Sequence, residues 1–448
     1  MTSPGANGPW GPSLRTTPLA PGTHRADVVV VGGGLTGLAA AWHLLRARPG
    51  LSVMLLEAGG LGGGASGRST GMLTPGVGQD LPGQVRRLGA ERARRLYRAT
   101  LQAVRDAAGL IAAEGIDCEL DLGGQLVLAR GPEGRARLET LAATLERLGL
   151  PCQRLDDAAR EAALRLDPAA LSPPGPGPAG LRLPLAGTLD PLRLVAGLAA
   201  RVTERGGRIH TDSPVARLVP GALLVGEGAS PAARVEAPRV VVAAGGLAPR
   251  LGLQQGRVLP LALRALVSEP LDAAARARLG WAGREGVIDS RRLFDYFRLT
   301  REGRIVFGGG RPAYRWGGRA PDPDARAAEG LERDFARLFP PGVAPRVAAT
   351  WTGTIDYTAD GLPVVGFDPE RPGVLHAGGW CGHGIALSLC AGRWAAALCA
   401  GEPLEDEDLP LFRARAPWVP GEPVRWLGVR AALALMAWSD RRPAAVRR

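Results

Sequence analysis

Three glycines and one carboxylate in the first part of the chain have the types and the spacing to hold a dinucleotide. Gly32, Gly34 and Gly37 follow the apolar run Val28–Val31, and Glu57 stands about 20 residues after the last of them. The first glycine permits a tight turn, the second lets the backbone approach a pyrophosphate, and the third lets a helix pack closely on a strand. The carboxylate can accept hydrogen bonds from ribose hydroxyls. The pattern therefore predicts a dinucleotide-binding site.

These residues need a strand–turn–helix–strand unit to position them, and the surrounding sequence predicts one. A helix is expected to run from the glycines to about Arg48, and a second apolar strand over Val53–Leu56 leads to the carboxylate. The helix N-terminus then offers unpaired N–H groups to phosphate oxygens. The alternative is a glycine-rich loop in an unrelated α/β protein, but strand, helix, second strand and acid all occur in the required order.

Two further glycine-rich loops indicate a flavin. Residues 65–71 (ASGRSTG) are small or carry hydroxyls, so that the backbone and Ser66 could approach a pyrophosphate and the ring system beyond it. A simple NAD enzyme has no need for this extra loop. Residues 377–385 (AGGWCGHGI) open a helix expected over 386–398. The N-terminus of that helix carries partial positive charge, which suits the negative charge that a reduced flavin gains near N1.

The length is sufficient to bury a large core, expected as two interleaved domains, and the apolar fraction is ordinary for a soluble protein. The chain has 448 residues and a net charge of +12, and it contains no lysine. Its arginines are scattered and not interleaved with aromatic residues, so a nucleic-acid partner is not favoured. The five cysteines form no CxxC pair, which argues against a zinc site or a disulfide framework, and we expect no metal. A reducing cytoplasm is the expected location.

The two ends of the chain differ from the middle. Residues 1–24 are rich in Pro, Gly and Thr and are expected to form a disordered leader. Residues 401–408 form an acidic loop, and Val424–Trp438 is a largely apolar helix flanked by Arg425, Arg430, Arg441 and Arg442. The helix is too short to span a membrane. It could lie on a membrane surface, although packing against its own domain is the preferred interpretation.

Four segments carry a resemblance to a known family: 59–73 (GGLGGGASGRSTGML), 296–310 (YFRLTREGRIVFGGG), 351–366 (WTGTIDYTADGLPVVG) and 378–388 (GGWCGHGIALS). Over roughly residues 25–440 the chain resembles the D-amino-acid-oxidase superfamily, most closely the gamma-glutamylputrescine oxidases and their bacterial relatives. The resemblance implies an α/β fold with a Rossmann-like FAD-binding domain assembled from discontinuous segments and an antiparallel-sheet substrate domain. The implied segments are 25–115, 186–255 and 345–400 for FAD, 116–185 and 256–344 for the substrate, and 401–448 for the C-terminal loop and helix.

The resemblance also implies how FAD is held. The expected contacts are Gly32, Gly34, Leu35, Thr36, Gly37, Glu57, Ala58, Ser66, Gly67, Arg68, Val215, Ala244, Gly245, Gly361, Gly382, Gly384 and Ile385. Members with a histidyl-linked flavin carry a histidine near the Ser66–Gly67 loop, where this chain has Arg68. The cysteine that sarcosine-oxidising members join to the flavin is also absent, so we expect FAD without a covalent bond.

The implied reaction is oxidative deamination of an amine by hydride transfer to flavin N5. Members that oxidise glycine or D-amino acids bind the substrate carboxylate through an arginine, where this chain has Ile355. We therefore expect a substrate like gamma-glutamylputrescine, or another amine with a remote carboxylate, with oxygen or a quinone as acceptor. The alternative is a D-amino-acid or glycine-type dehydrogenase that passes electrons to a quinone.

Four residues are candidates for the catalytic site. Arg311 could bind a remote carboxylate or could be a solvated arginine at a strand end. Tyr296 is expected to line the site on the strand face that it shares with Arg298, for which a structural role is the alternative. Tyr357 lies in the motif implied to face the flavin, but could be a core residue. His383 could handle a proton or could bond to the backbone of its loop.

Overall fold

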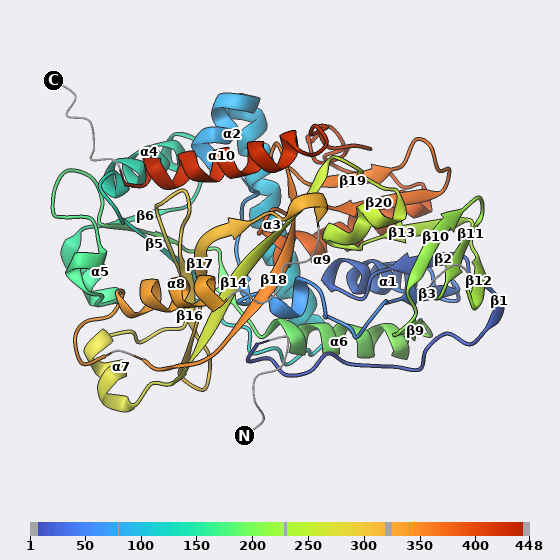
Figure 1. Cartoon of the computed structure of the whole chain (residues 1–448), viewed down its shortest axis with the longest axis horizontal. Coiled ribbons are helices and arrows are strands. Elements are labelled where there is room, and N and C mark those ends of the chain that lie inside the picture. The colour runs from blue at the N-terminus through green and yellow to red at the C-terminus, as the bar shows by residue number, and fades with distance from the viewer. Residues whose placement is uncertain (1–7, 79, 228–230, 319–324, 344, 442–448) are drawn as a thin grey trace.

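A six-stranded sheet forms the part of the protein that carries the glycine motifs. The computed structural model describes residues 8–78, 80–227, 231–318, 325–343 and 345–441, and Figure 1 shows their arrangement. The strands lie in the order β19-β20-β13-β2-β3-β9, all parallel except β19 at one edge. Their bounds are β2 (Val28–Val31), β3 (Val53–Leu56), β9 (Arg208–His210), β13 (Arg239–Val242), β19 (Val364–Phe367) and β20 (Val374–Gly378). The sheet is therefore assembled from segments far apart in the chain.

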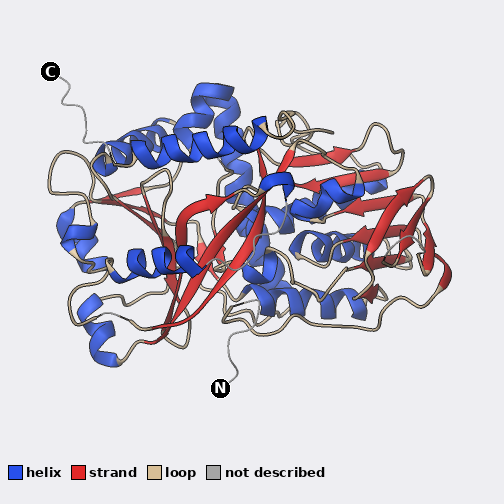
Figure 2. Cartoon of the chain, viewed as in Figure 1, coloured by secondary structure: helices blue, strands red, loops and turns tan. Residues whose placement is uncertain are grey.

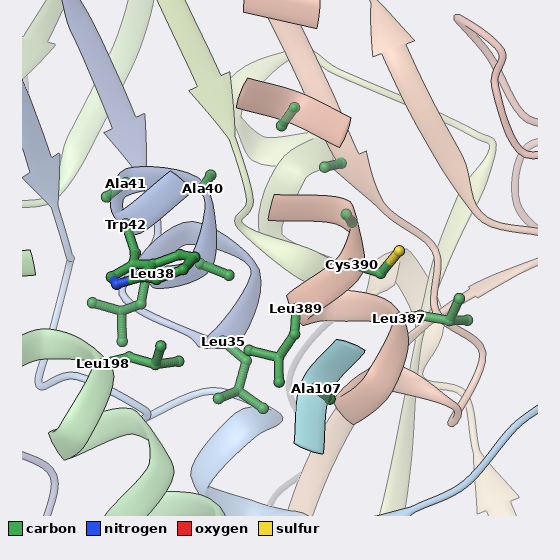
Figure 3. Packing of buried hydrophobic residues seen from close by; sticks show 14 of the residues in the cluster. Leu35, Leu38, Ala40, Ala41, Trp42, Ala107, Leu198, Leu387, Leu389 and Cys390 are labelled. Carbon is green, nitrogen blue, oxygen red and sulfur yellow. The ribbon is translucent and has the colours of Figure 1, made fainter. Parts of the chain in front are cut away.

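Three helices cover one face of this sheet: α1 (Leu35–Ala47), α6 (Pro191–Glu204) and α9 (Gly384–Ala400). A fourth helix, α3 (Ala90–Ala113), packs against α9, and together the four form the largest core. Figure 3 shows Leu38 and Leu198 meeting between α1 and α6, and Leu35 and Leu389 meeting between α1 and α9. Each such buried leucine contributes about 1.5–3 kcal/mol of burial free energy. The interface with α9 places Ser388 where the Thr36 hydroxyl donates to its Oγ at 2.9 Å.

A smaller sheet covers the opposite face. Its order is β1-β12-β11-β10, with β1 (Gly22–Arg25), β10 (Val215–Val219), β11 (Ala222–Val225) and β12 (Ala233–Glu236). Its apolar side chains pack against those of β2, β3 and β13, including Val29, Met54 and Val242. The large sheet is thus buried on both faces, which explains the uninterrupted apolar strands Val28–Val31 and Val53–Leu56.

An eight-stranded sheet forms the second half of the molecule, as the secondary structure in Figure 2 shows. Its order is β18-β14-β17-β16-β15-β5-β7-β6, antiparallel except for the pair β5–β15. The strands are β5 (Gln125–Leu128), β6 (Gln153–Leu155), β7 (Gly180–Leu183), β14 (Val258–Pro270), β15 (Gly286–Asp289), β16 (Tyr296–Leu299), β17 (Arg304–Ala313) and β18 (Val347–Thr358). Because β18 pairs with β14 along its length, residues 347–358 belong to this sheet and not to the FAD-binding segment 345–400 expected from the sequence.

Shorter elements complete the structure. They are the strands β4 (Met72–Leu73) and β8 (Gly187–Thr188), the helices α2 (Leu81–Leu88), α4 (Gly134–Arg147), α5 (Asp157–Ala163), α7 (Ala273–Leu279), α8 (Ala325–Ala336) and α10 (Val424–Ser439), and the 3₁₀ turns η1 (Ser66–Arg68), η2 (Pro168–Ala170), η3 (Gly245–Leu251) and η4 (Trp316–Gly318). The predicted C-terminal helix is thus present as α10, along the upper side of the molecule in Figure 1. Arg442, which was expected to flank it, lies outside the described residues. Among those residues, no helix has the length and apolarity needed to cross a membrane.

The N-terminal segment is ordered where the structure describes it. The Trp10 indole donates to the Ser69 carbonyl at 2.9 Å, and Leu14 pairs with Leu61 through the backbone. Further along, the Thr16 N–H donates to the Thr211 hydroxyl at 2.8 Å. The expectation of a disordered leader is therefore wrong for residues 8–24, because these contacts satisfy the polar backbone of a segment with few apolar residues. Residues 1–7 of that leader lie outside the described part.

Candidate functional site

The glycines at the end of β2 leave room that a side chain would fill. Gly32 has a φ of +113°, and a Cβ there would lie 2.5 Å from the Ala243 carbonyl oxygen. A Cβ on Gly34, the N-cap of α1, would lie 2.8 Å from Ser66 Oγ. This backbone therefore forms a cradle directly before the N-terminus of α1, where N–H groups point outward.

The two side chains beside the cradle are fixed by its backbone. Glu57 accepts from the Gly33 N–H at 2.6 Å and from the Gly59 N–H at 2.9 Å, and Ser66 Oγ accepts from the Leu35 N–H at 3.0 Å. A carboxylate has about four acceptor positions, so Glu57 keeps capacity for ribose hydroxyls. Its orientation is thus set before any ligand arrives, which the sequence alone did not show.

The second glycine-rich loop places a further donor at this site. The Arg68 carbonyl accepts from the Trp351 indole at 3.0 Å, which ties η1 to β18. Arg68 Nε is buried and has no hydrogen-bond partner in the described protein. A buried, unpaired guanidinium N–H next to the cradle is a group for which an anionic or carbonyl-rich cofactor would supply the acceptor. The cradle and this donor therefore fit FAD.

The other expected FAD contacts fall into two groups. Ala244 and Gly245 follow β13, beside Gly32, while Val215 begins β10 two residues after Ser213, whose N–H donates to the Glu57 carbonyl at 2.8 Å. Gly361, Gly382, Gly384 and Ile385 lie beyond β18 and at the start of α9, close to loop 76–78. Ala244 and Gly245 follow the parallel strand β13, and Gly382, Gly384 and Ile385 follow the parallel strand β20, so these residues stand at carboxyl ends of parallel strands, where ligands of α/β sheets bind.

Asp356 holds the glycine loop after β20 and was not singled out from the sequence. Its carboxylate accepts from the Gly379 N–H at 2.6 Å and from the Trp380 N–H at 3.2 Å. Burial raises the pKa of Asp356 from 3.8 to about 6. In the sequence, Asp356 is marked only by its position shortly before Asp360-Gly361. That position does not reveal that its carboxylate is buried.

We expect Asp356 to make stability depend on pH in a defined direction. The folded protein binds a proton at this carboxyl more tightly than the unfolded chain, so its contribution to stability falls as pH rises from about 4 through about 6. Asp356→Asn lacks this titration. As pH rises over this range, the thermal midpoint of the wild type should therefore fall relative to that of Asp356→Asn. Parallel curves for the two proteins would contradict the assignment.

One face of the eight-stranded sheet brings several of the predicted residues together. The register of β14, β16, β17 and β18 places Tyr296, Arg298, Trp351, Ile355 and Tyr357 on the same face. This face meets η1 and loop 76–78, since Gly353 lies against Arg68 and the Tyr357 hydroxyl donates to the Gly78 carbonyl at 3.4 Å. The opposite face packs on α8 through Phe307 and Phe335.

Arg298 has a structural role. Its guanidinium donates to the carbonyls of Thr70 and Leu189, each at 2.6 Å, and to that of Leu299 at 3.2 Å. The Trp10 ring lies 4.9 Å from its Cζ. Because three carbonyls occupy its donors, this arginine does not offer a free fork to a substrate carboxylate.

The four predicted catalytic residues take different positions. Burial raises the pKa of Tyr296 and of Tyr357 to about 12, so both hydroxyls stay protonated. His383 is the N-cap of α9, and its Nδ1 has no hydrogen-bond partner in the described protein. Burial lowers the pKa of its imidazole. Arg311 lies apart from these groups on an exposed strand end, where it donates to the Arg430 carbonyl of α10 at 3.0 Å.

An apolar cluster beside Ile355 was also missed from the sequence. Leu259, Leu261 and Tyr314 pack together with Ile355, Tyr357 and, from α10, Trp426 and Val429. The helix from the far end of the chain therefore lies over the same part of the sheet as the candidate substrate residues. The sequence signal for this contact was the three-residue spacing of Trp426 and Val429, which places both side chains on one face of the helix.

Comparison with known proteins defines the class. The family model described as FAD dependent oxidoreductase matches residues 27–398, and the chain belongs to this family. It is 30% identical over 389 residues to the gamma-glutamylputrescine oxidoreductase of Escherichia coli (strain K12), covering 84% of each chain. It is also 30% identical over 399 residues to the probable oxidoreductase OrdL of Rhizobium meliloti (strain 1021), covering 88% of this chain and 87% of that one.

The fold comparison agrees. The crystal structure of glycine oxidase from Geobacillus kaustophilus superposes with a TM-score of 0.68 at 25% identity, covering 87% of this chain and 99% of that one. The predicted resemblance, the FAD cofactor and the two-part α/β architecture are thereby confirmed. The protein is an FAD-dependent oxidoreductase.

Proposed function

We propose that this oxidoreductase removes a hydride from the carbon next to the nitrogen of an amine that carries no carboxylate on that carbon. The observation that carries the proposal is the wall around Ile355. Leu259, Leu261 and Tyr357 surround this side chain, and Arg298 on the same face is occupied by backbone carbonyls. An apolar wall leaves a carboxylate on the reacting carbon without its charge-assisted pair. The similarity to gamma-glutamylputrescine oxidoreductase supports an amine with a remote carboxylate.

The chain's own residues bind and orient such a substrate. The aromatic rings of Tyr296 and Tyr357 provide flat apolar surfaces for a methylene chain. Arg311, exposed where β17 meets α10, would pair with the remote carboxylate. The neutral His383 ring, with its free Nδ1, can accept the proton that a protonated amine sheds. Bound FAD supplies the two-electron acceptor, and water hydrolyses the imine product.

The electron acceptor is oxygen or a quinone. This sequence has no lysine, so no lysine ammonium group beside the flavin can stabilise the negative charge that develops as oxygen is reduced. We therefore propose slow re-oxidation by oxygen, FAD held without a covalent bond, and a cytoplasmic location. Acid precipitation that leaves the flavin in the supernatant would support the non-covalent linkage.

The deciding experiment is anaerobic mixing of the flavin-loaded enzyme with a panel of amines, followed by admission of air. Gamma-glutamyl amines, polyamines, sarcosine, glycine and D-amino acids are each tested for bleaching of the flavin band near about 450 nm. Bleaching by gamma-glutamyl amines in preference to the amino acids supports the proposal. Faster bleaching by glycine or D-amino acids would favour instead the amino-acid dehydrogenase that uses a quinone.

Ile355→Arg is expected to change the substrate preference. A guanidinium at this position gives an α-carboxylate a bidentate partner, which is worth about 1.5–3 kcal/mol for a charged hydrogen-bonded pair. The ratio of kcat/KM for glycine to kcat/KM for the best amine should rise by about tenfold or more. Ile355→Met is the matched control, because it keeps the side chain apolar. An equal ratio in the two variants would show that residue 355 does not face the reacting carbon.

A further inference from the structure

We infer that the outward face of α10 docks on an anionic membrane surface. The helix carries an apolar stripe at helical spacing: Val424, Leu427, Ala431, Leu435 and Trp438. These side chains are exposed, with 57% of Leu427, 62% of Leu435 and 49% of Trp438 accessible. Such a stripe along a helix of 16 residues, about 24 Å long, is an extended apolar surface that isolated exposed leucines do not form.

The opposite face of α10 already has its partners. Trp426 and Val429 pack against the cluster around Leu259 and Leu261, and Leu433 is buried. The helix is therefore fixed to the protein by one side, and the apolar stripe is additional to what its own packing needs. The helix also lies beyond residues 27–398, which the family model matches.

The charges around the stripe identify the occupant. The helix contains no acidic residue, and Arg430 and Arg441 are exposed beside it. The neighbouring acids face inward: Glu422 accepts from the Tyr314 hydroxyl at 2.6 Å and from the Trp426 N–H at 3.0 Å. At the other end, Asp440 accepts from Arg137 at 2.5 Å and from the backbone N–H of Arg292 and Leu293.

This leaves an apolar face bordered by arginines, with exposed tryptophans at both ends. Trp316 lies beside the first turn, its ring 6.3 Å from that of Trp426, and Trp438 lies in the last turn. Tryptophans favour the headgroup level of a bilayer, arginines pair with anionic headgroups, and the apolar stripe enters the acyl boundary. The net charge of +12 adds a long-range attraction to the same surface.

The docking would place the candidate substrate wall next to the bilayer. Ile355 and Tyr357 belong to the apolar cluster that the inward face of α10 covers. The outward face of the same helix is the one that would meet the bilayer. The docking surface does not depend on the proposed amine substrate, since it rests on α10 and the neighbouring Trp316.

The test is sedimentation of the flavin-loaded enzyme with lipid vesicles. Vesicles of phosphatidylglycerol and phosphatidylcholine in about equal parts should carry the enzyme down, and vesicles of phosphatidylcholine alone should not. Raising the salt from about 0.1 M to about 1 M should weaken the binding, because the screening length falls from about 10 Å to about 3 Å. Leu427→Glu combined with Leu435→Glu should weaken it by about tenfold or more.

Leu122→Glu is the matched control, because Leu122 is an equally exposed leucine (54%) outside α10. It should bind vesicles like the wild type, and all variants should keep the wild-type thermal midpoint and flavin content. Vesicle binding that is absent in the wild type, or retained by the α10 double variant, overturns the inference. A dimer that the double variant separates, with no vesicle binding, assigns the face to a second copy instead and also overturns it.

Discussion

Gly37→Ala is expected to yield protein that purifies without flavin and unfolds at a lower temperature. Gly37 lies in the first turn of α1, and a Cβ there would stand 1.9 Å from the Gly32 carbonyl oxygen and 3.2 Å from Val30 Cγ1. Both contacts are with the fixed strand and turn, so α1 must move away from β2. Overpacking of this kind costs about 3 kcal/mol or more.

The displacement would also disturb the cofactor cradle, because the same turn presents the N–H groups for the pyrophosphate. The measurement is the ratio of flavin to protein absorbance after purification, together with the thermal midpoint. Gly109→Ala is the matched control: it also lies inside a helix, α3, but a Cβ there meets nothing within 4 Å. It should keep its flavin and gain about 0.5–1 kcal/mol from reduced backbone freedom. Normal flavin content in Gly37→Ala would refute the close approach of helix and strand.

Arg298→Met is expected to destabilise the fold without acting through substrate binding. The Arg298 guanidinium donates to the carbonyls of Thr70, of Leu189 before α6, and of Leu299 in β16, and so connects three segments of the chain. Arg298 itself is only 1% exposed. Methionine fills part of the volume but leaves these acceptors unpaired. Each unpaired buried group costs about 1–3 kcal/mol, so a loss of about 3 kcal/mol or more is expected.

The measurement is chemical denaturation followed by flavin release and by circular dichroism. Arg301→Met, an exposed arginine three residues further on, should be within about 0.5 kcal/mol of the wild type. A stable Arg298→Met protein with a raised KM would instead show that this arginine binds substrate. A lower stability with unchanged KM, measured below the melting range, is the expected pair of results.

Local patterns were sufficient for the parts of the fold that depend on neighbours in sequence. The strand Val28–Val31, the helix after the glycines and the strand Val53–Leu56 were predicted and are confirmed as β2, α1 and β3. Their apolar runs and glycine spacing are short-range signals. The C-terminal helix was found for the same reason, since its residues have no competing turn signal.

Contacts between segments far apart in the chain could not be predicted from such short-range patterns. The leader was expected to be disordered because it has few apolar residues, yet residues 8–24 bond to Ser69 and Thr211 through polar groups. Residues 347–358 were assigned to the wrong part because only the pairing with β14 reveals their sheet. For Arg311, composition does not show that its guanidinium meets the Arg430 carbonyl.

The packing of α1 against α9 has a consequence for synthesis of the protein. Helix α1 leaves the ribosome early, but α9 and β20, which complete its packing and the flavin site, are made only near residue 400. At about 5–20 residues per second, the apolar side of α1 waits tens of seconds for its partner. A nascent chain is therefore unable to bind flavin until translation is nearly complete. Premature termination anywhere before α9 yields a cofactor-free product with an open core, a substrate for chaperones and proteases.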